Sequence, residues 1–198
     1  MYLGEYESLQ VLHNWKITHI GDNDRIFEYC DELKVEIKDK KISLTLLNKK
    51  KYQLLPLKEY LVELMIRQID LENLHNESLP MILQKISMMW FIIQKIHEEY
   101  KSIELNHKLK FIQSDEGSLI TEVPVIFRQL KSKIKINLIV GKDLLVNYPL
   151  SIKSLKVEVI NEIGNLDTES INNTITQNLT SFKSNSNILE QALESIHL

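Results

Sequence analysis

The feature that most constrains this chain is an order of segments that occurs twice along it. An amphipathic helical segment, four short segments of alternating apolar and polar residues, and a closing helical segment fill residues 1–76. The same order returns in residues 77–198. Alternation with a period of two is typical of half-buried antiparallel strands, and short connections allow only hairpins. The sequence therefore predicts two tandem α+β units, each with a four-stranded antiparallel meander, packed on each other.

The first copy opens with a helical stripe at residues 2–13. Its apolar face, which we expect to extend a coiled coil from upstream, consists of Tyr2, Leu3, Tyr6 and Leu9. The alternating segments predict strands at residues 15–20, 26–30, 33–38 and 42–46. A helix is then expected to begin near Pro56, because proline is favoured in a first turn.

The second copy begins with the longest predicted helix, at residues 79–105. Its main apolar stripe is enough to cover one sheet, yet four further apolar residues lie off that stripe: Met81, Met88, Phe91 and Ile92. We expect this surplus to be buried by the first unit or by an outside partner. A Met-rich surface adapts well to such a partner, so these four residues are candidate binding residues.

The second meander is predicted at residues 109–113, 119–128, 132–140 and within 150–163. Pro124 inside the second of these strands indicates an edge or a bulge. Two helices are expected in the tail, interrupted near residues 184–187, with Asp167 or Thr168 as the cap of the first.

The composition excludes several classes of partner. The formal net charge is −3, and only three of the 24 basic residues are arginine, the best reader of phosphates and base edges. We therefore expect no direct contact with nucleic acid. The longest apolar run, residues 88–93, is far shorter than the roughly 20 residues that cross a bilayer. No membrane contact is expected, and the single cysteine fits a reducing compartment.

The sequence carries no catalytic, metal or cofactor motif, so we expect a protein without enzymatic activity. Cys30 has no basic neighbour to activate it and is expected to be a core or half-buried residue. His97, Glu98 and Glu99 are expected to form a solvated helix face. The two tryptophans, Trp15 and Trp90, are expected to anchor the cores of their units.

Two lysine clusters leave two interpretations open. They are the run at residues 49–51 and the set Lys131, Lys133 and Lys135. Both clusters fit a solvated hairpin end or strand face, and both also fit a site for an acidic peptide or phosphates. The second cluster is therefore included among the candidate partner-binding residues.

The order of helix, antiparallel meander and closing helix resembles the RWD fold. The Tyr148-Pro149 dipeptide after the third strand of the second copy is similar to one that often follows that strand in RWD domains. The first copy lacks the dipeptide, and no second proline follows it at short spacing in the second copy.

Two stretches resemble more closely the C-terminal region of the large kinetochore scaffold family (blinkin, the kinetochore-null protein and their fungal relatives). They are EYESLQ at residues 5–10 running into HNWKI at residues 13–17, and the helix around residues 86–100 with Trp90. The resemblance implies a tandem RWD module in the nucleus, at the centromere. It would attach the scaffold to subunit tails of the MIND complex and so support chromosome segregation and checkpoint signalling. It also implies a Zwint-type coiled-coil partner upstream.

Three alternatives stand beside this expectation, and the sequence argues against the third. The module could be an RWD-type adaptor of another complex, or a homodimeric structural domain. The third, a domain like a ubiquitin-conjugating enzyme, needs a reactive cysteine after the sheet, and residues 141–170 contain none.

Overall fold

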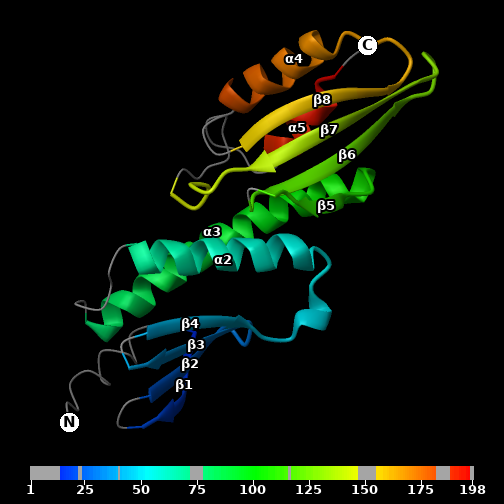
Figure 1. The fold of residues 1–198 in the computed structure, drawn as a ribbon. Coiled ribbons are helices and arrows are strands. Elements are labelled where there is room, and N and C mark those ends of the chain that lie inside the picture. The colour runs from blue at the N-terminus through cyan, green and yellow to red at the C-terminus, as the bar shows by residue number, and fades with distance from the viewer. Residues whose placement is uncertain are drawn as a thin grey trace. The chain divides into compact units, whose positions relative to one another are not determined.

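The structure is a computed structural model of the 198-residue chain. It describes residues 14–21, 24–39, 41–71, 78–115, 117–146, 155–181 and 188–196. The chain divides into two compact units, Met1–Ile93 and Gln94–Leu198. Each unit contains one four-stranded antiparallel sheet, which confirms the predicted α+β class with two tandem sheets (Figure 1).

Some predicted features lie outside the described residues and stay predictions. They are the helix at residues 2–13 with its coiled-coil face, the boundary between residues 76 and 77, and the Tyr148-Pro149 dipeptide.

The sheet of the first unit is an up-and-down meander. Its strands, paired in sequence order, are β1 (Trp15–Ile20), β2 (Asp24–Tyr29), β3 (Leu33–Lys38) and β4 (Lys41–Leu46). Alternation places Phe27, Val35 and Leu44 in one cross-strand row, and all three are buried. The predicted strands of this copy are thereby confirmed to within two residues at each end.

The turn between β2 and β3 corrects one prediction. Cys30 and Asp31 occupy it with φ values of +52° and +55°, a left-handed backbone that fits the twist of a hairpin. Because Cys30 lies in the turn and not on the apolar face of the sheet, it is exposed. Its predicted place in or near the core was wrong.

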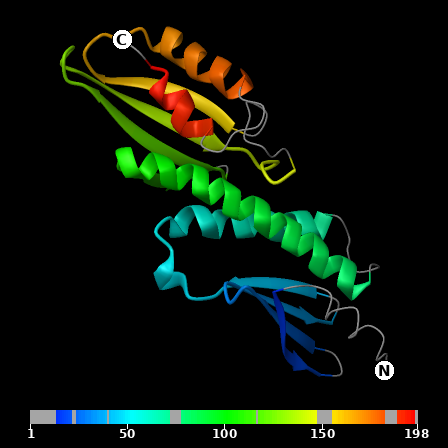
Figure 2. The same cartoon turned by 180° about the vertical axis from the view of Figure 1, so that it is seen from behind.

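Two helices contribute to the core of the first unit. α2 (Leu55–Leu71) has Pro56 in its first turn, as predicted, and buries Leu57, Leu61 and Leu64. The short 3-10 helix η1 (Lys49–Lys51) that precedes it is exposed, as expected for a solvated hairpin end. α3 (Leu79–Asn106) is a single unbroken helix (Figure 2), and its part up to Ile93 belongs to this unit.

Both tryptophans of the chain lie in the first unit. Trp90 on α3 is buried, and the ring of Trp15 on β1 lies 4.8 Å from that of Tyr29 and 6.4 Å from that of Phe27, centroid to centroid. Trp15 Nε1 also donates a hydrogen bond of 2.8 Å to the hydroxyl of Ser87 on α3. These contacts join β1, the edge strand of the sheet, to the helix layer.

A lysine is buried in this core. Lys58 on α2 is only 2% exposed, and its Nζ lies 3.8 Å from the ring centroid of Tyr52 and 5.1 Å from that of Trp90. A carboxylate oxygen of Glu32 lies 4.0 Å away. Loss of water around the ammonium lowers the pKa of Lys58, and Glu32 opposes this shift only in part. The buried charge of Lys58 therefore lowers the stability of the folded protein. The rings of Tyr52 and Trp90 and the carboxylate of Glu32 offset part of this loss.

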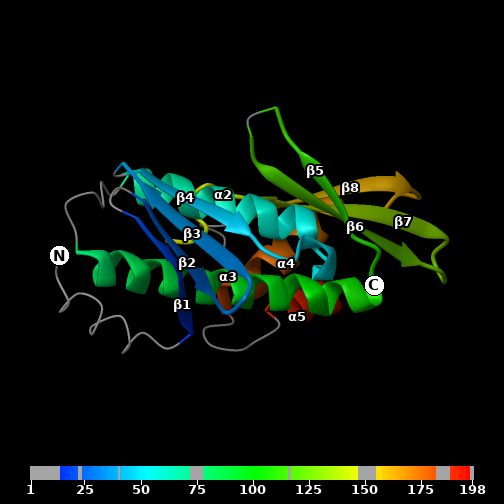
Figure 3. The ribbon, with the colours of Figure 1, turned by 90° about the horizontal axis from the view of Figure 1, so that it is seen from below.

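The second unit repeats the meander with longer strands. They are β5 (Lys110–Gln113), β6 (Leu119–Phe127), β7 (Ser132–Val140) and β8 (Leu155–Ile163), paired in sequence order. Ile134, Ile136 and Leu138 are fully buried on the inward face, as predicted. The predicted tail helices are confirmed as α4 (Thr168–Ser181) and α5 (Ile188–Glu194), which lie on one side of this sheet (Figure 3).

Pro124 lies at a local edge, as its residue type predicted. The last residue of β6 that pairs with β5 is Glu122, so β5 does not extend to Pro124. The carbonyl oxygen of Pro124 lies 3.2 Å from Nδ1 of His107. The β6–β7 register shows no bulge at this point, so the edge, not the bulge, is the correct alternative.

Glu99 corrects a second prediction. This α3 residue is 5% exposed, and its Oε2 accepts a hydrogen bond of 3.2 Å from the backbone N–H of Leu189 in the first turn of α5. Glu98 is exposed, as expected, and forms an ion pair of 2.8 Å with Lys95. The expected solvated face is therefore wrong for Glu99, because α5 supplies a backbone donor that a carboxylate can satisfy inside the core.

None of the described helices combines the length and the apolar character needed to span a membrane.

We expect Lys58→Met to raise the free energy of unfolding of the first unit by about 1 kcal/mol at neutral pH, because methionine keeps the apolar stem and removes the buried charge. Between its lowered pKa and the usual value of 10.5, the unfolded chain binds the proton of Lys58 more tightly than the folded protein does. Stability of the wild type therefore rises with pH in this window, and the advantage of the variant should shrink toward pH 10.5.

Denaturant titration followed by tryptophan fluorescence measures this effect, since both tryptophans report on the first unit. Lys38→Met, at the exposed end of β3, is the matched control and should change stability little. A Lys58→Met protein less stable than the wild type at neutral pH would contradict the proposed net cost.

Candidate functional site

The described residues contain no group of three or more His, Cys, Asp or Glu side chains placed to hold a metal ion. Partial desolvation of the Cys30 thiol, together with the nearby carboxylates of Glu32 and Asp31, raises the pKa of Cys30. A raised pKa disfavours the reactive thiolate. The predicted binding residues lie instead on two surfaces, one on α3 and one on the second sheet.

The first surface, called the α3 stripe below, is the set Met81, Met88, Phe91 and Ile92. Met81, Met88 and Phe91 are 50%, 62% and 61% exposed, and Ile92 is partly exposed. At about 100° per residue these four positions fall within roughly 100° of one another around the helix. The buried residues Ile86 and Trp90 lie on the opposite side. The stripe is therefore a second, largely exposed apolar face of α3.

The second surface is the outward face of the β5–β8 sheet. Because side chains alternate along each strand, the residues between the buried positions of β7 point outward, among them Lys133 and Lys135. The register sets their neighbours: Lys133 pairs with Ile126 and Ile163, and Lys135 pairs with Pro124 and Ile160. Each of these two lysines of β7 thus lies in a cross-strand row between an apolar residue of β6 and an apolar residue of β8.

Ion pairs organise the charges of this face. Glu122 on β6 accepts a bond of 2.7 Å from Lys135 and lies 3.3 Å from Lys110 on β5. Glu162 on β8 lies 2.7 Å from Lys133. The hydrogen bond from Lys135 holds the pKa of Glu122 below its usual value, and the same bond raises the pKa of Lys135. Both side chains remain charged at neutral pH.

The same residues surround a shallow depression of about 320 Å³, called the lysine depression below. Its lining consists of Lys108, Leu109, Lys110, Glu122, Pro124, Lys133, Lys135 and Glu162. Four lysines face two glutamates, so the local charge is positive although the chain as a whole is negative. Lys108 forms no ion pair with any residue in the described ranges and is exposed.

The structure separates the predicted lysine cluster. Lys133 and Lys135 both line the depression, half-buried and ion-paired, whereas Lys131 lies in the exposed turn before β7 with a φ of +49°. The sequence patterns did not identify four further residues of this face. Lys110, Glu122 and Glu162 lie on other strands, and Lys108 lies in the connection between α3 and β5. For the three strand residues, the only signal was the alternation of β5, β6 and β8. Alternation shows on which face of the sheet a residue lies, but it does not show which residue of the next strand pairs with it.

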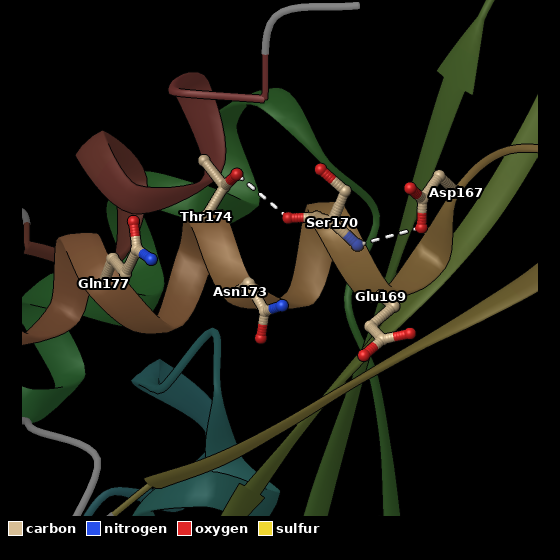
Figure 4. A pocket seen from close by; sticks show the side chains of 6 residues that line it. All are labelled: Asp167, Glu169, Ser170, Asn173, Thr174 and Gln177. Carbon is tan, nitrogen blue, oxygen red and sulfur yellow. Dashed lines mark hydrogen bonds between the residues drawn. The ribbon is translucent and has the colours of Figure 1, made fainter.

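A second depression of about 410 Å³ lies along α4 (Figure 4). Polar side chains line it: Asp167, Glu169, Ser170, Asn173, Thr174 and Gln177. Two of its hydrogen bonds serve the helix itself. Asp167 Oδ1 accepts from the backbone N–H of Ser170 at 3.0 Å, and the Thr174 hydroxyl donates to the Ser170 carbonyl at 3.0 Å. Asp167 is thus the helix cap, one of the two predicted candidates, and the depression is an open polar helix face.

The chain matches none of the protein-family models and none of the curated proteins with which it was compared.

We expect Asp167→Ala to destabilise α4 by about 1 kcal/mol, because the backbone N–H of Ser170 loses its partner. Amide hydrogen exchange in the first turn of α4 should become faster in the variant. Asn173→Ala, at an exposed position in the middle of the same helix, is the control and should leave that exchange unchanged. Equal exchange in wild type and Asp167→Ala would exclude Asp167 as a stabilising cap.

Glu122→Gln should lower the stability of the second unit by about 0.5 kcal/mol at neutral pH, since the ion pairs of Glu122 are only partly shielded from water. The folded protein lowers the pKa of Glu122 from its usual 4.5, so the carboxylate stabilises the unit above that value. The contribution is lost as the pH falls through the lowered pKa. The difference between wild type and variant should therefore vanish in acid.

Urea titrations at a series of pH values, followed through NMR signals of β6 and β7 amides, measure this difference. Glu158→Gln on β8 is the control, because its partner Lys156 is 71% exposed, and a change near zero is expected. A difference between wild type and Glu122→Gln that persisted in acid would show that charge is not its cause.

Proposed function

We propose that this chain is a non-enzymatic protein-docking module. The observation that carries the proposal is the α3 stripe, where Met81, Met88 and Phe91 are each at least half exposed on a helix whose other face forms a core. A second apolar face on one helix is costly in water unless a protein surface covers it. Methionine side chains suit such a surface because they repack easily around a partner.

We further propose that the module is the tandem RWD region of a large kinetochore scaffold. Support comes from the resemblance of residues 5–17 and of the helix around Trp90 to that family, and from an architecture of two four-stranded meanders with helices. On this proposal the module acts in the nucleus, at the kinetochore. It binds subunit tails of the MIND complex, and residues upstream of β1 bind a Zwint-type coiled coil.

Two alternatives predict different results for the binding of the MIND complex and for the mass of the chain in solution. An adaptor of another complex would be monomeric on its own and would not bind the MIND complex. A homodimeric structural domain would cover the α3 stripe with a second copy of the chain, and light scattering would then show a mass that depends on concentration.

We expect the double substitution Met88→Glu and Ile92→Glu to weaken binding of the MIND complex at least tenfold, because two buried carboxylates would replace apolar contacts at the centre of the α3 stripe. Isothermal titration of the purified complex into the full chain measures the affinity. Tryptophan fluorescence verifies that the first unit stays folded in the variant.

Leu105→Glu is the matched control, since Leu105 is an exposed apolar residue of the same helix outside the stripe. The affinity of the Leu105→Glu variant for the MIND complex should equal that of the wild type. Wild-type binding by a folded double variant would remove the α3 stripe from the interface, and a wild-type chain that failed to bind the complex would refute the kinetochore assignment.

A further inference from the structure

We infer that the lysine depression of the second sheet binds an acidic segment of a partner protein, one whose carboxylates alternate with aliphatic side chains. The inference rests on the proposed docking role and adds the chemistry of the partner. It concerns a surface distinct from the α3 stripe, so the two can be tested separately.

The first argument is charge complementarity. The depression presents four lysines against two glutamates, and both glutamates are already engaged by lysines at 2.7 Å. The ammonium of Lys108 has no carboxylate partner in the described part of the chain. An incoming carboxylate therefore meets a net positive surface in a chain whose total formal charge is −3.

The second argument is the apolar surface beside these charges. Ile126, Ile160 and Ile163 are 65%, 41% and 59% exposed, and each is a cross-strand neighbour of Lys133 or Lys135. Leu109 and Pro124 add aliphatic surface inside the depression. Apolar residues rimmed by charges mark a binding surface, and the alternation of lysine with isoleucine matches a ligand that alternates carboxylates with aliphatic groups.

The third argument concerns how the ligand is held. Strand addition needs free backbone donors and acceptors along an edge. Just beyond the start of β5, Pro124 on β6 has no N–H to offer, and its carbonyl oxygen already lies 3.2 Å from His107 Nδ1. Side chains of the sheet face, not the backbone of this edge, therefore provide the contacts.

Nucleic acid fits this surface less well than a protein segment does. Glu122 lies between Lys110 and Lys135 and would repel the closely spaced phosphates of a nucleic-acid strand. The lining contains no arginine, the side chain that pairs best with phosphate. A flexible acidic peptide can place its carboxylates beside the lysines and its aliphatic side chains on the isoleucines.

The probe is a fluorescein-labelled peptide of about twelve residues in which aspartate and leucine alternate, long enough at about 3.3 Å per residue to cross the sheet. Fluorescence anisotropy with the full chain measures binding. We expect affinity to fall as salt rises, and to fall at least tenfold when asparagine replaces aspartate or serine replaces leucine in the peptide.

Lys133→Gln with Lys135→Gln should weaken binding of the probe at least tenfold. The matched control is Lys34→Gln with Lys38→Gln on β3 of the first sheet, where one lysine is also ion-paired and the other exposed. Circular dichroism verifies folding. If the double variant does not fold, the exposed Lys108→Glu carries the test and should weaken binding as well.

Glu162→Gln should tighten binding, because it releases Lys133 from its partner. Three results would each overturn the inference. The first is equal affinity of the wild type and the folded lysine variants for the probe, and the second is equal affinity of the wild type for the aspartate and asparagine peptides. The third is tighter binding of single-stranded DNA than of the probe. Met88→Glu with Ile92→Glu should leave probe binding unchanged. A failure to bind the MIND complex would therefore refute the kinetochore assignment without affecting this result.

Discussion

Antiparallel pairing of alternating strands is the constraint on which both units depend. Each strand places every second side chain on the same side, and antiparallel pairing carries this alternation across each sheet, apart from register shifts between Ile17 and His19 in β1 and between Lys133 and Ile134 in β7. One side of each sheet is therefore apolar and must be covered, as Val35 and Ile136 are. The other side remains available for charge. The helices, the buried cores and the lysine depression all follow from this division.

The local patterns of the sequence were enough to predict most elements. Alternation located β3, β4 and β7 almost to the residue, and helical periodicity located α2 and α3. Residue chemistry also placed the cap at Asp167 and the strand edge at Pro124. In each case the determining interaction lies within a few residues along the chain.

The errors arose where distant segments decide the environment. Glu99 is buried because the start of α5, 90 residues later, donates a hydrogen bond to it. The neighbours of Lys135 come from β6 and β8, whose register no short pattern specifies. Cys30 was placed wrongly for a local reason, because the left-handed turn began one residue earlier than the alternation suggested.

Both cores tolerate polar groups that a purely apolar design would avoid. Lys58 holds a charge among aromatic rings in the first unit. In the second, the hydroxyls of Tyr100 and Thr121 are buried, and neither forms a hydrogen bond of good geometry with any residue that the structure describes. Burial raises the pKa of Tyr100. Such groups lower stability, and they also penalise alternative packings in which a lysine or hydroxyl would lose even its present neighbours.

The division of the chain at residues 93 and 94 falls inside α3, which is a continuous helix from Leu79 to Asn106. This limits how the molecule can be dissected. A fragment cut before α3 would lose Ser87 and Trp90, and with them the partners of Trp15 and Lys58. A protease would find no exposed loop between residues 79 and 106. Separate expression of the halves requires both to keep part of the same helix, and overlapping fragments are the rational choice.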